Sequence, residues 1–158
     1  MLNILQKICA CLAIGLLVTG CEKNIPDIDT VYPVIETDGT NSFPVQCSRV
    51  KRGEPFVFKA TFSDNRQLGA FSLDIHHNFD HHTHSTEVSN CQTDKVKVPK
   101  NPFLFIKSFD IPANLTRFEA SQQIDIPADI DPGDYHFLIR LTDQEGWQTI
   151  KGISFKIE

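Results

Sequence analysis

Residues 131–157, DPGDYHFLIRLTDQEGWQTIKGISFKI, decide the fold of this chain. After the Asp-Pro-Gly-Asp turn, apolar side chains occupy every second position from Tyr135 to Leu141. A period of two is typical of a β-strand with one buried face. The turn sequence Asp143-Gln144-Glu145-Gly146 follows, and the alternation resumes from Ile153 to Ile157. The stretch therefore predicts a β-hairpin.

The same period of two runs through the preceding residues. Residues 56–62 and 71–75 place apolar side chains at alternate positions, and looser strands are predicted at 32–36 and 118–126. Residues 103–106 are apolar on both faces, so they form either a buried strand or a plug in a loop. No stretch of useful length has the 3.6-residue period of a helix. About seven short strands predict an all-β domain over residues 34–158, an immunoglobulin-like antiparallel β-sandwich.

The composition narrows the classes of function. The chain has 158 residues, of which 41% are hydrophobic, so its length and apolar content suit one globular domain. Fifteen basic residues stand against 20 acidic ones, which gives a net charge of −5, and the basic residues form no run. We therefore expect no nucleic-acid partner, because such a partner requires a basic surface along its phosphates.

The N-terminal residues have the pattern of a secretion signal. An apolar run from Ile8 to Val18 is too short to cross a membrane as a helix, but it suits a signal peptide. The run ends in Val-Thr-Gly-Cys at 18–21, which looks like a bacterial lipobox. We predict a lipoprotein signal peptide at 1–20, lipidation of Cys21 and a lipidated tether at 21–33. The alternative is an ordinary signal peptide followed by a chance cysteine.

Only Cys47 and Cys91 remain beyond the predicted lipidation site. In an exported protein, an even pair of cysteines predicts a disulfide, which here closes a loop of about 44 residues. The alternative is a pair of thiolate metal ligands, but their neighbours include no CxxC partner.

The histidines carry the chemistry that is most specific to this sequence. Five of six lie within nine residues, in IHHNFDHHTH at 75–84. Imidazole is the commonest protein ligand for zinc and copper. The predicted metal ligands are His76, His77, His81, His82, His84 and His136.

The strand pattern predicts how these histidines converge. If the apolar side chains of 71–75 and 135–141 face the core, His76 and His136 face outward on neighbouring strands of one sheet. The loop that carries 81–84 then folds back over that pair, whereas His77 faces inward or marks the strand end.

Asp74 and Asp80 are predicted to orient these histidines or to add an oxygen ligand, in a site suited to Zn²⁺, Cu²⁺ or Ni²⁺. Two alternatives remain: a solvated loop without a ligand, and a pH-responsive surface without a metal. The acidic turns at 125–134 and 142–146 also offer oxygen ligands for Ca²⁺, although such residues are more often ordinary turn chemistry.

Three segments together resemble a known family: FKATFSDNRQLGAFSLDIHHNFDHHTH at 58–84, NPFLFIKSFDIP at 101–112 and IPADIDPGDYHFLIRLTDQEGW at 126–147. They are similar to the domain-of-unknown-function family 4625, and the resemblance covers residues 34–158. It implies an immunoglobulin-like domain in an exported lipoprotein of the outer membrane of a Gram-negative bacterium, on the periplasmic or the surface face. It implies no catalytic residues.

We therefore expect a lipid-anchored envelope protein that binds a transition metal, zinc or copper, and is not an enzyme. No nucleophile motif or phosphate-binding loop is present, although a histidine-bound metal with an open position would be able to activate water. The competing hypothesis is a cell-envelope module that binds a protein or a glycan, with incidental histidines.

Overall fold

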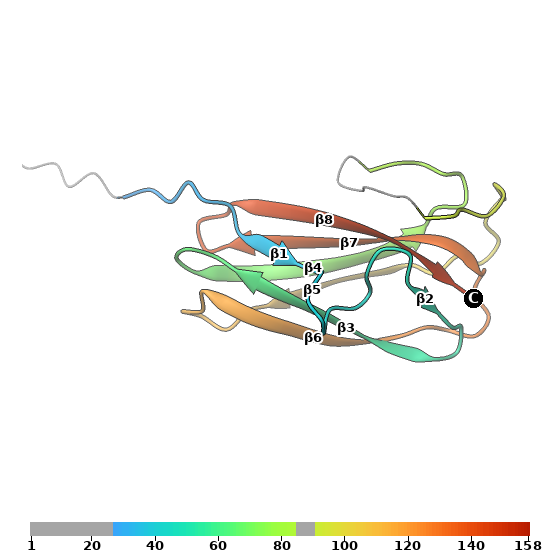
Figure 1. Ribbon diagram of the computed structural model, residues 1–158, viewed down its shortest axis with the longest axis horizontal. Helices are drawn as coiled ribbons and strands as arrows, with labels where there is room; N and C mark the ends of the chain where they lie inside the picture. The colour runs from blue at the N-terminus through green and yellow to red at the C-terminus, as the bar shows by residue number, and fades with distance from the viewer. Residues whose placement is uncertain (1–26, 85–90) are drawn as a thin grey trace, which may run out of the picture.

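The computed structural model describes residues 27–84 and 91–158, which fold into two stacked β-sheets (Figure 1). The predicted signal peptide and Cys21 lie outside the described residues. Within the described part, no helix is long and apolar enough to cross a membrane. The described strands are β1 (Val34–Glu36), β2 (Arg49–Val50), β3 (Pro55–Ser63), β4 (Leu68–His77), β5 (Phe105–Asp110), β6 (Arg117–Asp125), β7 (Gly133–Asp143) and β8 (Gln148–Ile157).

The sheet topology confirms the predicted β-sandwich. One sheet has the strand order β1-β3-β6 and the other has the order β2-β8-β7-β4-β5. Strand β7 thus lies between β4 and β8, the position that strand F takes between strands C and G in an immunoglobulin domain. The predicted hairpin of β7 and β8 forms with antiparallel pairing from Gly133↔Ile157 to Thr142↔Gln148.

The core between the sheets is built from the alternating apolar residues. In β3 every second side chain from Phe56 to Phe62 is buried, and in β7 the rings of Tyr135 and Phe137 are almost completely buried. Phe58 of the smaller sheet stacks on Phe137 of the larger one, with 5.4 Å between ring centroids. Phenyl rings thus join the two layers.

Tyr135 at the start of β7 fixes two loops to the core. Its hydroxyl donates to the carbonyl oxygen of Asp131 at 2.6 Å and accepts from the backbone N–H of Phe103 at 3.1 Å. A tyrosine that bonds to backbone just upstream of this strand is a hallmark of immunoglobulin-type sandwiches.

The structure adds one short strand, paired in parallel, to the predicted set of about seven. The described residues form eight strands because β2, which the sequence analysis missed, lies parallel to β8 with Val50 opposite Ile157. Two residues are too few to show a period. This strand is held by backbone bonds, including those from Glu158 N to Val50 O and from Lys156 N to Ser48 O.

The structure also decides between the two predictions for residues 103–106, a buried strand and a plug in a loop. Phe103 is buried before the strand begins, so it acts as the plug, whereas Leu104 is 65% exposed and Ile106 is 67% exposed. Strand β5 forms the edge of the larger sheet, and a buried strand is therefore the wrong description of this segment. An edge strand has one neighbour and keeps one side open to solvent.

The predicted disulfide joins Cys47 to Cys91. It connects the segment before β2 with the segment that follows the histidine loop. The backbone N–H of Cys47 also donates to the carbonyl oxygen of Ser154 in β8 at 2.8 Å, which ties this covalent link to the larger sheet.

We expect Tyr135→Phe to lower the free energy of unfolding by about 1–3 kcal/mol, because the buried N–H of Phe103 loses its acceptor. Urea denaturation measures the change. Tyr32→Phe is the matched control, since the Tyr32 ring is 54% exposed and packs on Trp147. Equal stability of the two variants would contradict the role assigned to the Tyr135 hydroxyl.

Candidate metal centre

The pairing of β4 with β7 places two histidines opposite each other. His76 and His136 are register partners, as the strand pattern predicted, and their ring centroids are 5.5 Å apart. Both point away from the apolar core because Ile75 and Phe137, one position along, fill it.

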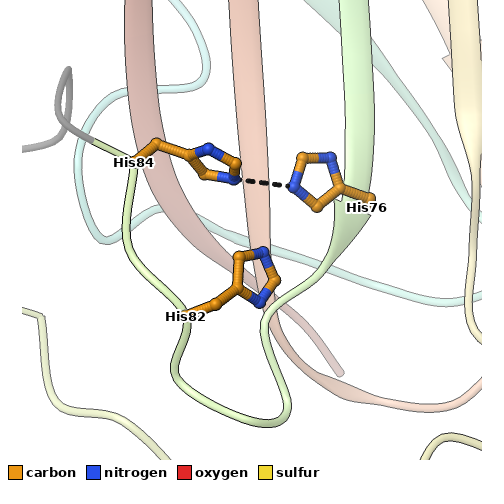
Figure 2. A group of neighbouring side chains, drawn as sticks. All are labelled: His76, His82 and His84. Atoms are coloured by element: carbon orange, nitrogen blue, oxygen red, sulfur yellow. Dashed lines mark hydrogen bonds between the residues drawn. The ribbon is translucent and has the colours of Figure 1, made fainter.

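The loop after β4 returns over this pair. Phe79 anchors the loop because its buried ring packs on Tyr135, with 5.3 Å between centroids. The backbone N–H of Asn78 donates to the carbonyl oxygen of Asp134 at 2.8 Å. The chain then reverses at His81, whose φ of 59° is left-handed. Figure 2 shows the result: the loop brings His82 and His84 to face His76.

Three imidazoles converge in this loop. His76, His82 and His84 each offer one ring nitrogen, and these three nitrogens lie within 4.8 Å of one another. The Nε2 atoms of His76 and His84 are 3.1 Å apart, the contact dashed in Figure 2. All three side chains are partly buried. The arrangement brings ring nitrogens from two segments to one small volume.

Two carboxylates set the tautomers of this triad. The Nδ1–H of His76 donates to Asp74 Oδ1 at 2.8 Å, and the Nδ1–H of His82 donates to Asp80 Oδ1 at 2.6 Å. A proton on Nδ1 leaves Nε2 with its lone pair, which is the form that binds a metal. The hydrogen bond from His82 also lowers the pKa of Asp80, so this carboxylate stays ionised.

His136 lies beneath the triad. Its side chain is 1% exposed, and its Nε2–H donates to the carbonyl oxygen of His82 at 3.1 Å. The six centroid distances among the rings of His76, His82, His84 and His136 all fall between 4.8 and 5.6 Å. The four rings therefore pack against one another, and three of them bring a ring nitrogen to one small volume.

Burial favours the neutral form of two of these imidazoles. Desolvation, together with the smaller effect of the neighbouring histidines, lowers the pKa of His136 from 6.5 to about 4. Desolvation, followed by the nearby His76 and His82, also lowers the pKa of His84. A neutral imidazole has the lone pair that a metal needs, so the lowered pKa values of His84 and His136 favour the binding form of these two rings.

The other two predicted ligands lie outside the triad. His77 has the opposite strand parity from His76, and its ring stacks on Phe79 at 4.9 Å. His81 occupies the reversal of the loop, and its buried Nε2 has no hydrogen-bond partner among the described residues. His76 and His77 separate because neighbouring residues of a strand point to opposite sides, whereas the left-handed backbone at His81 separates it from His82.

The sequence matches the model of a domain of unknown function, DUF4625, over residues 19–158. The chain belongs to this family. The family description names no activity, and no curated protein shows a significant match to the chain. The function of the DUF4625 domain is therefore inferred from its own side chains.

We expect the metal-free domain to lose stability as the pH falls from about 6.5 to about 4. The pKa of His136 lies below its unfolded value, so the unfolded chain binds the proton first and stability is complete only above pH 6.5. The loss from this residue is about 3 kcal/mol. Urea denaturation across this range in the presence of a chelator measures it.

His136→Gln is the matched variant, since its amide N–H also reaches toward the His82 carbonyl without titrating. Its stability must change less with pH than that of the parent chain. Identical pH profiles would show that His136 does not carry the effect.

Proposed function

We propose that this protein is a lipid-anchored envelope protein that binds Zn²⁺ or Cu²⁺ through His76, His82 and His84, without catalysing a reaction. The convergence of the three ring nitrogens within 4.8 Å carries the proposal. Ligand nitrogens at about 2.0–2.1 Å from a tetrahedral zinc lie about 3.3–3.4 Å apart. The 3.1 Å between two Nε2 atoms of the triad is close to that spacing.

The donor chemistry favours these metals. Neutral imidazoles suit Zn²⁺ and Cu²⁺, whereas Ca²⁺ and Mg²⁺ prefer oxygen ligands. Asp74 and Asp80 already accept hydrogen bonds from His76 and His82. A carboxylate in this position orients a ligating imidazole and raises its basicity.

The position of His136 favours a metal site that binds an ion without catalysing a reaction. Four imidazoles around a tetrahedral ion have ring centroids about 5 Å apart, and the four rings here have centroid distances of 4.8–5.6 Å. His136 lies outside the group of converging nitrogens, but a turn of its ring that brought Nδ1 to the ion as a fourth ligand would leave no open position for a reacting water. Catalytic zinc sites retain such a position.

The anchoring part of the proposal rests on the N-terminal sequence. The lipobox-like 18–21 and the short apolar run before it support export and lipidation of Cys21. The resemblance to the family implies retention at the outer membrane of a Gram-negative bacterium, on its periplasmic or surface face. A metal-binding domain on such an anchor would scavenge or deliver ions in the cell envelope.

We expect the full chain in detergent, stripped of metal, to bind one Zn²⁺ or Cu²⁺ per molecule in calorimetric titrations. His82→Ala and the double variant His76→Ala, His136→Ala must abolish this binding because each removes ligand nitrogens.

Asp74→Asn must weaken binding by about 10–100-fold in the same titrations, because it removes the carboxylate that orients His76.

His81→Asn is the matched control. It alters a histidine of the same loop outside the triad, and asparagine tolerates the left-handed backbone at this position. It must bind the metal as the parent does. Affinity weaker than about millimolar in the parent chain, or unchanged binding by His82→Ala, would contradict the proposal and favour a module that binds an envelope protein or a glycan.

A further inference from the structure

A second cluster of ionisable side chains lies at the other end of the sandwich. Asp29 precedes β1, Asp64 lies in the turn between β3 and β4, and Asp143 ends β7. One carboxylate oxygen from each lies within 4.8 Å of the other two. Three segments that are far apart in the sequence thus bring like charges together.

Each of these carboxylates uses one oxygen to hold its own loop. Asp29 Oδ1 accepts from the backbone N–H of Val31 and from the Asn65 amide, both at 3.0 Å. Asp64 Oδ2 accepts from two backbone N–H groups of its turn, both at 2.8 Å. Asp143 Oδ1 accepts from two backbone N–H groups of the β7–β8 turn, at 2.6 and 2.7 Å.

The second oxygen of each carboxylate is buried without a hydrogen bond. Asp29 Oδ2, Asp64 Oδ1 and Asp143 Oδ2 have no hydrogen-bond partner among the described residues. Asp29 and Asp143 are each only 3% exposed. Burying an ionised carboxylate without a partner is strongly unfavourable, so unpartnered oxygens on three neighbouring carboxylates indicate a missing positive charge.

Arg66 supplies part of that charge. Its Nε lies 3.9 Å from Asp29 Oδ2. However, its guanidinium bonds mainly to Asp27, through the carboxylate at 2.6 Å and the carbonyl oxygen at 2.8 Å. Arg66 is shared with Asp27, so it does not balance the three carboxylates, of which two are buried and that of Asp64 is partly buried; a divalent cation would supply the remaining positive charge.

We propose that Asp29, Asp64 and Asp143 form a Ca²⁺ site that ties the N-terminal segment to the end of the sandwich. An all-oxygen donor set selects a hard cation. Two oxygens that contact one Ca²⁺ at 2.3–2.6 Å are at most about 5 Å apart, which the spacing of this cluster satisfies. Calcium also accepts irregular geometry and further carbonyl or water oxygens, whereas Mg²⁺ requires a near-ideal octahedron.

The site would fix the segment that enters the domain. Of the three aspartates, Asp29 alone lies before the first strand, whereas Asp64 follows β3 and Asp143 ends β7. The carbonyl oxygen of Asp29 accepts from the indole N–H of Trp147 at 2.8 Å, and the Tyr32 ring packs on that indole at 5.0 Å. A bound ion would add a direct link from Asp29 to both turns, so residues 27–33 would become rigid when Ca²⁺ is present.

Trp147 makes the site measurable in the unmodified chain. It is the only tryptophan, and its backbone N–H and indole contact Asp143 and Asp29. Terbium replaces calcium at oxygen sites and emits when a nearby tryptophan is excited. In the full chain in detergent, we expect tryptophan-sensitised Tb³⁺ emission that added Ca²⁺ displaces, together with a rise of the melting temperature in Ca²⁺.

Asp143→Asn tests the cluster directly. The amide oxygen keeps the bonds to the turn, but the charge is lost, so the variant must fold yet show no Tb³⁺ emission and no Ca²⁺-dependent rise in melting temperature. Glu145→Gln in the same turn is the matched control, because Glu145 is exposed, and it must behave as the parent does. His82→Ala must also retain the Ca²⁺ response, which separates this site from the histidine cluster.

Two results would overturn the inference. One is the absence of Tb³⁺ emission and of any shift of melting temperature in millimolar Ca²⁺ for the parent chain. This result would mean that Arg66 alone compensates the charge of the three carboxylates. The other is an undiminished response in Asp143→Asn, which would place the ion elsewhere.

Discussion

The register between β4 and β7 is the constraint on which the rest of the structure depends. It puts Ile75 opposite Phe137 on the core face and His76 opposite His136 on the other face. Side chains alternate along a strand, so a slip of one residue would turn the phenyl rings outward and the imidazoles into the core. The packing energy of Phe137 and its neighbours therefore also fixes the positions of the histidines.

The sequence predicts those strands in which apolar and polar residues alternate. The period of two locates β3, β4, β7 and β8, and strand parity predicts the pairing of His76 with His136. It gives no signal for β2, because two residues cannot show a period. It also cannot separate His81 from His82, because their roles depend on a left-handed backbone at the loop reversal.

The aspartate cluster was beyond prediction for a different reason. Asp143 belongs to a turn whose calcium-binding potential is visible in the sequence, but its partners come from residues 29 and 64. Only the folded sandwich brings the three together, and aspartate is so common in turns that spacing alone carries little information. By contrast, five histidines within nine residues are unusual enough to indicate a ligand set before the fold is known.

The strands separate the two clusters by the length of the sandwich. Leu68 of β4 pairs with Asp143, and eight residues later His76 pairs with His136, a rise of about 26 Å. The described chain enters at the aspartate end, whereas the histidine loop lies at the opposite end (Figure 1). Electrostatic fields in physiological salt decay over about 8 Å. For a chain anchored at Cys21 and standing upright, the histidines would therefore be insensitive to the charge of the lipid headgroups and would sample ions at their bulk concentration.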